Sequence, residues 1–369
     1  MKPMTIGIIG CGNISNIYMK NAARFPVLKL KSCADINQAA ADAKAAEHNI
    51  QSTSVDAMLA DPEIEMIINL TIPAVHAKIN NQILNAGKHA YAEKPIATTL
   101  EDARGTLALA KKKKLRVGCA PDTFLGAGLQ TCRKIIDDGW IGKPLAGTAF
   151  MLGGGPEGWH PNPAFFYEKG AGPMLDVGVY YITALVHLLG PAKAVTAVTG
   201  RGFPYRLATC KEHFNEKLKI EVPTHYAGVI EFKSGALITT TVSFDIKKHT
   251  HSPIEIYGES GTLGVPDPNT FGNEVKLFRP GNAEWKTMSY VSAYSENSRI
   301  LGAADMATAI RANRPHRASG DLAFHVLDIM YAFERASDAG KRVELDSRCD
   351  QPEPFPLDLV TGLLDEGKK

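Results

Sequence analysis

The sequence of 369 residues carries 41 Lys+Arg against 39 Asp+Glu, a formal net charge of +2, and 44% hydrophobic residues. At about 150 residues per domain this length predicts two domains, and the composition excludes wholesale disorder. The near-neutral charge offers no broad field to nucleic acid, and no stretch of sequence approaches the ~18 uninterrupted apolar residues of a membrane span. We therefore expect neither nucleic acid nor a membrane as a partner.

The start of the chain and its cysteines predict a cytoplasmic protein. The apolar run at residues 5–10 is too short for the core of a signal peptide. The six cysteines form no C-x-x-C pair, which disfavours a zinc site and a disulfide framework and fits a reducing compartment. We therefore expect no bound metal.

Short apolar runs alternate with helix-like segments in the first third of the chain. Strands that alternate with helices predict βαβ units and a doubly wound parallel sheet, here in a domain of residues 1–122. The four lysines at 111–114 end one helix-like segment, where a solvated helix C-terminus favours cations. The expected strands are 6–9, 27–34, 66–70, 89–92 and 115–119, and the expected helices are 15–25, 37–48, 74–86 and 100–113.

Longer β-type runs dominate after residue 122. Turn signals at 233–235 and 258–261 join several of them, as in antiparallel hairpins. We expect residues 123–369 to form an α+β domain around an open, mainly antiparallel sheet, so that the whole chain is an α/β protein. The expected helices are 129–138, 174–189 and 322–339, and the expected strands are 145–152, 194–200, 224–232, 236–244, 253–257, 275–278, 286–290 and 342–345.

Two features near the C-terminus give no indication of function. His325 lies in an otherwise apolar amphipathic helix, so we expect a structural role for it. The Pro-rich segment 351–356 is either an ordered arm or a loose end, and the sequence leaves both open.

A glycine-bearing turn links the first expected strand to the first expected helix. The first glycine allows the tight turn and the second lets the backbone approach a pyrophosphate, while the helix N-terminus offers unpaired N–H groups to the anion. Ser15 stands where this dinucleotide-binding pattern has Gly or Ala. The turn residues expected to bind the cofactor are Gly10, Cys11, Gly12, Asn13 and Ile14.

Asp35 ends the second expected strand, 20 residues beyond Ser15 (35 − 15). An acidic side chain at this place accepts hydrogen bonds from the ribose hydroxyls of the cofactor. Its charge repels a 2′-phosphate, so we predict NAD rather than NADP. The alternative is that Asp35 only caps the helix expected near Asn37.

Two further stretches of the sequence are the most informative about the family to which the chain is similar. The first comprises residues 70–76 with 86–89 and Glu93-Lys94-Pro95, and the second comprises residues 170–180. With the glycine turn, they resemble the glucose–fructose oxidoreductase/inositol dehydrogenase/MocA (GFO/IDH/MocA) family over essentially the whole chain. The resemblance implies an N-terminal Rossmann domain and a C-terminal α/β domain through whose open sheet the protein forms a homodimer or homotetramer. It also implies nicotinamide-dependent redox chemistry on sugars, polyols and their derivatives.

The resemblance also implies roles for individual residues. The family more often has a histidine where this sequence has Tyr180, which leaves the identity of the acid/base open. For three of these residues a purely structural role is the alternative: His76 holds a loop, Asp176 caps its helix, and Tyr180 is a core tyrosine. Carried over by position, Thr71, Ile72, Pro73 and His76 line the cofactor, Glu93 and Lys94 lie beside the nicotinamide, and Asp176 and Tyr180 face the substrate.

The residue types suit the oxidation of a secondary alcohol, which must lose a hydride and a hydroxyl proton. The cofactor takes the hydride, and a protein group must handle the proton. An isolated tyrosine has a pKa near 10, but a nearby lysine cation favours its ionised form. Asp176 and Tyr180 are four residues apart, hence on one face of a helix. We predict that Lys94 orients the hydroxyl and relays charge, Tyr180 is the general acid/base, and Asp176 positions both.

A Gly/Pro-rich loop at residues 153–163 is the candidate substrate loop. Long loops of this kind inside a compact fold are often functional. Trp159 and His160 combine an apolar face with a polar tip, which suits the mixed faces of a sugar ring. Asp122 follows the last parallel strand, where strand ends open onto a ligand crevice. Plain loop packing is the alternative for all three residues.

The sequence thus predicts an NAD(H)-dependent dehydrogenase or reductase acting on a cyclic sugar, polyol or sugar derivative. One alternative is a glycosidase that retains NAD and cleaves by oxidation, elimination and re-reduction. The other is a non-catalytic regulator that senses NAD or a sugar, against which the intact Lys94, Asp176 and Tyr180 argue.

Overall fold

The structure is a computed structural model that describes residues 1–357 and 359–366. The chain divides into two compact units, and the first contains residues 1–127, 292–324, 352–357 and 359–366. The second contains residues 128–291 and 325–351. The two compact units therefore differ from the predicted domains, which have a single boundary after residue 122. The difference arises because two later segments of the chain belong to the first unit. The assignment of cofactor binding to residues 1–122 and substrate binding to 123–369 stays a prediction.

A six-stranded sheet with the strand order β3-β2-β1-β4-β5-β6 forms the centre of the first unit. Every strand pair in it is parallel, which confirms the predicted doubly wound sheet. The strands are β1 (Met4–Ile9), β2 (Leu28–Ala34), β3 (Gln51–Ser52), β4 (Met66–Asn69), β5 (His89–Ala92) and β6 (Val117–Cys119). The helices are α1 (Ser15–Ala22), α2 (Gln38–His48), α3 (Val55–Ala60), η1 (Pro73–Val75), α4 (His76–Asn85), α5 (Leu100–Lys113), η2 (Thr123–Leu125) and α8 (Leu301–Arg311).

Local chemistry sets the ends of α5. The hydroxyl of Thr99 accepts a hydrogen bond from the Asp102 N–H at 3.1 Å, which caps the first turn. Lys111, Lys112 and Lys113 are exposed in the last turn, as expected for cations at a helix C-terminus. The basic run is therefore a solvated helix end, as the sequence predicted.

A nine-stranded sheet with the order β16-β15-β14-β13-β7-β12-β11-β8-β17 forms the second unit. Only the β12–β7 pair is parallel among the described pairs, so the sheet is mixed but mostly antiparallel, as predicted. The strands are β7 (Pro144–Leu152), β8 (Ala192–Gly200), β11 (His225–Phe232), β12 (Leu237–Ser243), β13 (Ile254–Gly258), β14 (Gly261–Val265), β15 (Val275–Phe278), β16 (Lys286–Met288) and β17 (Val343–Glu344). The hairpin β9 (Tyr205–Leu207) and β10 (Lys217–Lys219) stands apart from it.

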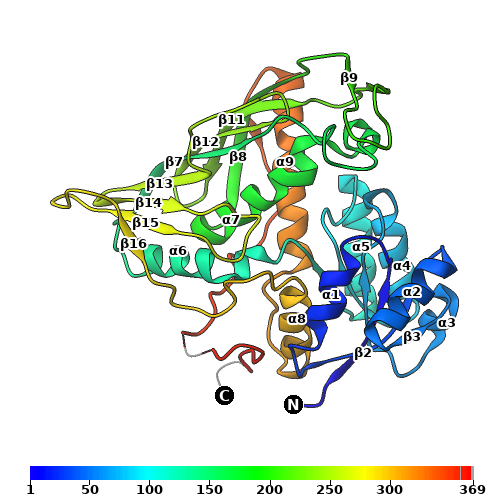
Figure 1. Ribbon diagram of the computed structural model, residues 1–369. Coiled ribbons are helices and arrows are strands. Elements are labelled where there is room, and N and C mark those ends of the chain that lie inside the picture. The colour runs from blue at the N-terminus through cyan, green and yellow to red at the C-terminus, as the bar shows by residue number, and fades with distance from the viewer. Residues whose placement is uncertain (358, 367–369) are drawn as a thin grey trace. The chain divides into compact units, whose positions relative to one another are not determined.

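Helices cover one face of this sheet: α6 (Ala127–Asp137), α7 (Val179–Leu189) and α9 (Gly320–Ala339) lie along the same side (Figure 1). His325 of α9 accepts the Ala192 N–H at 3.0 Å, and Ser337 accepts the Thr199 N–H at 3.0 Å, so α9 is bonded to β8. The ring of His325 thus has the structural role that the sequence indicated. Burial lowers its pKa to about 4.

The opposite face of the sheet is exposed and apolar in part. Val198 on β8 is 71% exposed and Leu237 on β12 is 50% exposed. Thr196 and Thr239, on the same two strands, are also exposed. At these four positions the exposed side chains are Val, Leu and Thr.

Several elements were not predicted from the sequence. Helix α8, strand β14 and the β9–β10 hairpin are additional, as are the short β3 and α3. The helix expected at 174–189 begins as a π-helix, η4 (Met174–Gly178), before α7. The short η3 (Ala164–Tyr167) directly follows the loop expected at residues 153–163.

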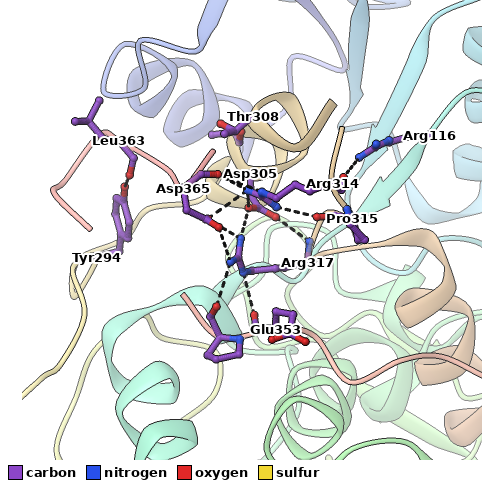
Figure 2. Close-up of polar contacts among 12 residues, drawn as sticks. Arg116, Tyr294, Asp305, Thr308, Arg314, Pro315, Arg317, Glu353, Leu363 and Asp365 are labelled. Atoms are coloured by element: carbon purple, nitrogen blue, oxygen red, sulfur yellow. Dashed lines mark hydrogen bonds and ion pairs between the residues drawn. The ribbon is translucent and has the colours of Figure 1, made fainter. Parts of the chain in front are cut away.

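Residues 352–357 and 359–366 form an ordered arm on the first unit. Of the two alternatives for the Pro-rich segment, the structure thus has the ordered arm. Arg317 donates to the carbonyls of Glu353 and Pro354 at 2.9 and 3.1 Å, and its guanidinium lies 4.5 Å from the ring centroid of buried Phe355. Figure 2 shows the continuation of this cluster: Arg317 and Arg314 both bind Asp305 and Asp365. Asp305 lies on α8 and is fully buried, so the arm and α8 share one network of charges.

Candidate functional site

The turn after β1 requires glycine at its first position. Gly10 has φ +104°, and a Cβ there would lie 2.6 Å from the carbonyl carbon and oxygen of Leu70. The Gly10 N–H also donates to the Ala34 carbonyl at 2.8 Å. Gly10 therefore allows the end of β1 to lie against the ends of both β2 and β4.

The second glycine of the turn faces open space. No described atom outside its chain neighbours lies within 4 Å of the position that a Cβ on Gly12 would occupy. Ser15 begins α1, is buried, and its hydroxyl donates to the Gly12 carbonyl at 2.7 Å. The departure from Gly or Ala at this position thus adds a bond that fixes the turn. The open backbone before a helix N-terminus fits a pyrophosphate.

Asp35 holds the glycine turn. Its carboxylate accepts the Cys11 N–H at 2.7 Å through Oδ2 and the Asn37 N–H at 2.8 Å through Oδ1. The N-cap of α2 is Asn37, whose side chain accepts the Ala40 N–H at 3.4 Å. Asp35 is therefore not the side chain that caps this helix, and each of its oxygens retains a lone pair for a ribose hydroxyl.

The loop after β4 is organised by Asn69, which the sequence did not single out. The buried Asn69 accepts from the backbone N–H and the hydroxyl of Thr71 at 3.2 and 2.6 Å, and it donates to the His76 carbonyl at 3.1 Å. Ile72 is 66% exposed beyond this anchor. Pro73 starts η1. A polar residue at the end of an otherwise apolar run is the sequence signal that marks Asn69.

His76 lies between two carbonyls. Its Nδ1 is 2.7 Å from the Pro95 oxygen, and its Nε2 is 2.9 Å from the Thr71 oxygen. Burial lowers the pKa of His76, which favours a neutral ring with one N–H. The ring packs between the two loops and donates its one N–H to one of the two carbonyl oxygens, which agrees with the alternative that His76 holds a loop. A direct contact of His76 with a cofactor stays a prediction.

Glu93 fixes the backbone of Lys94 at the end of β5. Its Oε2 accepts the Lys94 N–H at 2.9 Å, and its Oε1 accepts the Tyr18 hydroxyl at 2.7 Å. Burial raises the pKa of Tyr18, so that its hydroxyl remains a donor. The peptide bond between Lys94 and Pro95 is cis. Tyr18 is a further residue of this neighbourhood that the sequence did not indicate, and it belongs to α1.

Asp122 is buried, and its contacts differ from those of a ligand-binding carboxylate. Its Oδ2 accepts the N–H groups of Ile300 and Gly302 at 3.0 Å each, at the start of α8. Burial raises the pKa of Asp122 to about 6. Of the two readings of Asp122, these contacts favour the packing role, and substrate contact stays a prediction.

Asp176 and Tyr180 lie one helical turn apart in the second unit. Asp176 is in the π-helix η4, and Tyr180 is in the first turn of α7. Pro173 occupies the N-cap position, so Asp176 is inside the helix rather than at its cap. Single π-helical turns inside α-helices occur frequently at functional sites. Tyr180 is buried, which leaves its core alternative open.

The loop of residues 153–163 presents Trp159 on its surface. Trp159 is 69% exposed and lies edge-on to His160 and Phe166, with ring centroids 5.4 and 6.3 Å away. His160 packs edge-on against Phe165 and Phe166, and its Nδ1 lies 3.0 Å from the Asn162 N–H. Trp159 is therefore an exposed ring that packs against the rings of His160 and Phe166.

Within residues 1–357 and 359–366, no three His, Cys, Asp or Glu side chains are grouped so as to hold a metal ion. No helix in the part of the chain that the structure describes is long and apolar enough to cross a membrane.

Comparisons with known proteins agree with this geometry. Residues 4–120 match the "Oxidoreductase family, NAD-binding Rossmann fold" model, and residues 129–264 match the "GFO/IDH/MocA C-terminal domain" model. The chain is 30% identical over 291 residues to dTDP-3,4-didehydro-2,6-dideoxy-alpha-D-glucose 3-reductase of Saccharopolyspora spinosa, covering 78% of this chain and 79% of the relative. It is 27% identical over 264 residues to 1,5-anhydro-D-fructose reductase of Ensifer adhaerens, covering 70% and 74%.

Similar solved structures support the fold. A levoglucosan dehydrogenase in complex with NADH superposes with a TM-score of 0.81 at 20% identity, covering 94% of this chain and all of that one. The two family models together span the parallel sheet and most of the mixed sheet. The chain belongs to the GFO/IDH/MocA family of oxidoreductases, with an NAD(P)-binding Rossmann domain followed by the family's C-terminal domain.

Proposed function

We propose that this protein transfers a hydride between NAD(H) and a secondary alcohol or ketone of a cyclic sugar, polyol or sugar derivative. The observation that carries the proposal is the glycine turn, which Asp35 bonds at Cys11 and which faces open space at Gly12, in a chain of an oxidoreductase family. The names of the two similar reductases and of the levoglucosan dehydrogenase each refer to a cyclic sugar substrate, which supports the substrate class.

The choice of NAD rests on the position of Asp35. Its carboxylate lies at the end of β2 and is bonded to the Cys11 N–H of the turn, so it adjoins the backbone that would hold the pyrophosphate. A 2′-phosphate beside this charge is repelled, whereas ribose hydroxyls donate to it. Turn residues Gly10, Cys11, Gly12, Asn13 and Ile14 would hold the pyrophosphate, with Thr71, Ile72, Pro73, His76 and Glu93 near the rest of the cofactor.

Three residues of this chain would handle the hydroxyl proton. The bound nicotinamide supplies the hydride acceptor or donor. Lys94, whose backbone Glu93 holds at the end of β5, orients the substrate hydroxyl and favours ionised Tyr180 by its charge. Tyr180 accepts or returns the proton, and Asp176, one helical turn before it, positions both groups.

The test is a panel of cyclic sugars and polyols incubated with NAD, monitored at the absorbance of reduced nicotinamide. Formation of NADH with at least one sugar is the expected result. Hydrolysis of a glycoside without net change in NAD would instead support an NAD-retaining glycosidase. Binding of NAD and sugar without either reaction would support a sensing regulator, and both outcomes contradict the proposal.

We further infer that the protein is a homo-oligomer, a dimer or tetramer, packed through the exposed face of the nine-stranded sheet. Exposed apolar side chains on one face of a sheet, such as Val198 on β8 and Leu237 on β12 with β11 between them, indicate an interaction surface when they form a patch. Strands β8, β11 and β12 pair in register, so these side chains lie on a continuous surface. Such a face becomes stable when a second copy covers it.

A further inference from the structure

A buried arginine lies beneath the loop that presents Trp159. Arg206 is on β9, and its guanidinium donates four hydrogen bonds. Nη1 donates to the Gly154 carbonyl at 2.8 Å and to Glu157 Oε1 at 2.5 Å. Nη2 donates to the Phe244 carbonyl at 2.7 Å and to the Asp245 carboxylate. One cation thus joins the loop to the segment that follows β12.

A second set of contacts closes around Glu157. The hydroxyl of Tyr167 donates to Glu157 Oε1 at 2.7 Å, and the Glu157 carbonyl accepts the N–H groups of Thr209 and Cys210 at 3.0 and 2.8 Å. Burial and the adjacent Glu157 carboxylate raise the pKa of Tyr167, which keeps its hydroxyl a donor. Glu157 is therefore fixed by both its side chain and its backbone.

The loop backbone is shaped to this cluster. Gly155 has φ +95°, and a Cβ there would lie 2.6 Å from Arg206 Nη1 and 2.7 Å from the Tyr167 hydroxyl. The chain at Gly155 thus wraps around the charged groups, where no side chain fits. Trp159 follows two residues after Glu157, and its ring lies edge-on to Phe166, the neighbour of Tyr167. The cluster consequently fixes both the backbone before Trp159 and the segment that places the Phe166 ring beside it.

The same region adjoins the helix that carries Asp176 and Tyr180. The Gly153 N–H donates to the Ser243 carbonyl at 2.9 Å, which anchors the loop at the end of β12. Val242, one residue earlier, would lie 3.3 Å from a Cβ on Gly178. Gly178 stands midway between Asp176 and Tyr180. The end of β12 therefore lies between the loop and the helix within the second unit.

From this arrangement we infer that Arg206 is a positioning residue for substrate binding, which holds the Trp159 indole where it stacks on the apolar face of a pyranose ring. The inference rests on the proposed function and narrows its substrate class to ring-form sugars. An indole face packs against the C–H groups of a flat ring, whereas an open-chain polyol presents no such face. Removing Arg206 leaves Glu157 and Asp245 buried without their cation, so the loop must open to hydrate them.

The experiment uses Trp159 as its own reporter. The chain has three tryptophans, and a Trp140→Phe/Trp285→Phe background leaves Trp159 alone to emit. This parent is titrated with methyl α-D-glucopyranoside, and D-glucitol serves as the open-chain comparison. We expect a saturable change in Trp159 emission with the pyranoside and a far weaker response to D-glucitol. In the same background Arg206→Met should weaken pyranoside binding at least tenfold and lower the anisotropy of Trp159, while NADH binding stays unchanged.

Arg342→Met is the matched control. Arg342 contacts Glu231 of β11 through two nitrogens in the same unit, and Glu231 pairs with Leu237 at the start of β12, the opposite end of that strand from Ser243, where the loop is anchored. This variant should keep full pyranoside binding. Arg206→Lys retains the charge but loses the forked contacts, so partial rescue is expected, and it replaces Arg206→Met if that variant does not fold.

The inference is overturned if the pyranoside leaves Trp159 emission unchanged in the parent, or if Arg206→Met binds it as the parent does. Its failure is separable from that of the proposed function. NADH formation with a silent Trp159 removes only the inference. Pyranoside binding at Trp159 without NADH formation by any sugar removes only the proposed reaction.

Discussion

Arg317 binds the carboxylate of Asp365 through two nitrogens: Nη1 lies 2.9 Å from Oδ1, and Nη2 lies 3.1 Å from Oδ2. The pair joins the ordered arm to the segment that follows α8. Two parallel bonds from a planar guanidinium are stronger and more directional than a single contact.

Replacing Asp365 should therefore destabilise the protein. Asp365→Ala removes these bonds and leaves a buried guanidinium partly unpaired, which should lower the free energy of unfolding by about 2–3 kcal/mol. Asp137→Ala is the control, because Asp137 also binds an arginine through two oxygens, at 2.8 Å each, but is 40% exposed. The control should cost under about 1 kcal/mol in urea denaturation. Equal losses in both variants would contradict the role of the arm.

The raised pKa of Asp122 predicts a pH dependence of stability. Burial raises this pKa to about 6, above the value of about 3.9 in an unfolded chain. Between these values the folded state binds the proton more tightly, so the contribution of Asp122 to stability falls as the pH rises from about 4 to about 6. Asp122→Asn cannot titrate.

The measurement for Asp122 is urea denaturation of both proteins at pH 4, 5, 6 and 7. The wild type should lose up to about 3 kcal/mol relative to Asp122→Asn across this range. Above pH 7 the difference should be constant. Parallel curves for the two proteins would show that this carboxyl does not titrate near pH 6.

Lys94→Met tests the proposed proton chemistry. The variant should lower turnover at least about 100-fold, because it removes the cation that orients the hydroxyl and favours ionised tyrosine. NADH affinity, read by nicotinamide fluorescence, should stay nearly the same, since the Glu93 contact uses the Lys94 backbone. Lys113→Met, at the exposed end of α5, is the control. Near-normal turnover in Lys94→Met would remove this assignment.

Asp35→Asn tests the cofactor preference. Loss of the charge should raise the affinity for NADPH relative to NADH by roughly tenfold, equivalent to about 1.4 kcal/mol. The amide has one oxygen acceptor, so it can keep one of the two bonds that Asp35 accepts, from the Cys11 N–H or from the Asn37 N–H. Asp42→Asn, an exposed carboxylate on α2, is the control for net charge. An unchanged ratio of the two dissociation constants would show that Asp35 does not select the cofactor.

Val198→Lys tests the proposed oligomer interface. A lysine on the exposed face of β8 places like charges at a symmetric contact, so the assembly should dissociate toward the 39.8 kDa chain. Light scattering after size exclusion measures the mass. Ile36→Lys, at an exposed position of the first unit, should leave the mass unchanged. A parent that already has the mass of one chain, or a variant that stays assembled, would contradict the interface.

The sequence predicted elements that have a clear period or a clear boundary. Strands β1 and β4 are short apolar runs between turns, and α5 carries both end signals, so their bounds were close to those observed. Helix α8 had no such signal, because it is buried on nearly all sides and therefore lacks a polar face. Its buried charged residue, Asp305, is paired with Arg314 and Arg317, and no local sequence pattern predicts these pairs.

In the candidate site, too, residues with a local sequence signal were predicted, whereas contacts between residues distant in sequence were not. Gly10, Gly12 and Asp35 form a motif with fixed spacing, and the structure brings the turn and the carboxylate together. Asp122 was located correctly at a strand end, but its partner helix is distant in sequence and was not predicted. Glu157 and Arg206 are 49 residues apart, and only the folded chain shows that they meet.

The return of the last residues to the first unit has a consequence for biosynthesis. The six-stranded sheet leaves the ribosome first, whereas α8, Arg317 and Asp365 leave it at least 182 residues after β6 (301 − 119 for the start of α8). A nascent chain halted before residue 352 therefore carries Arg314 and Arg317 without the arm that binds them. The part of the protein made earliest is therefore completed only after the whole second unit has been synthesised.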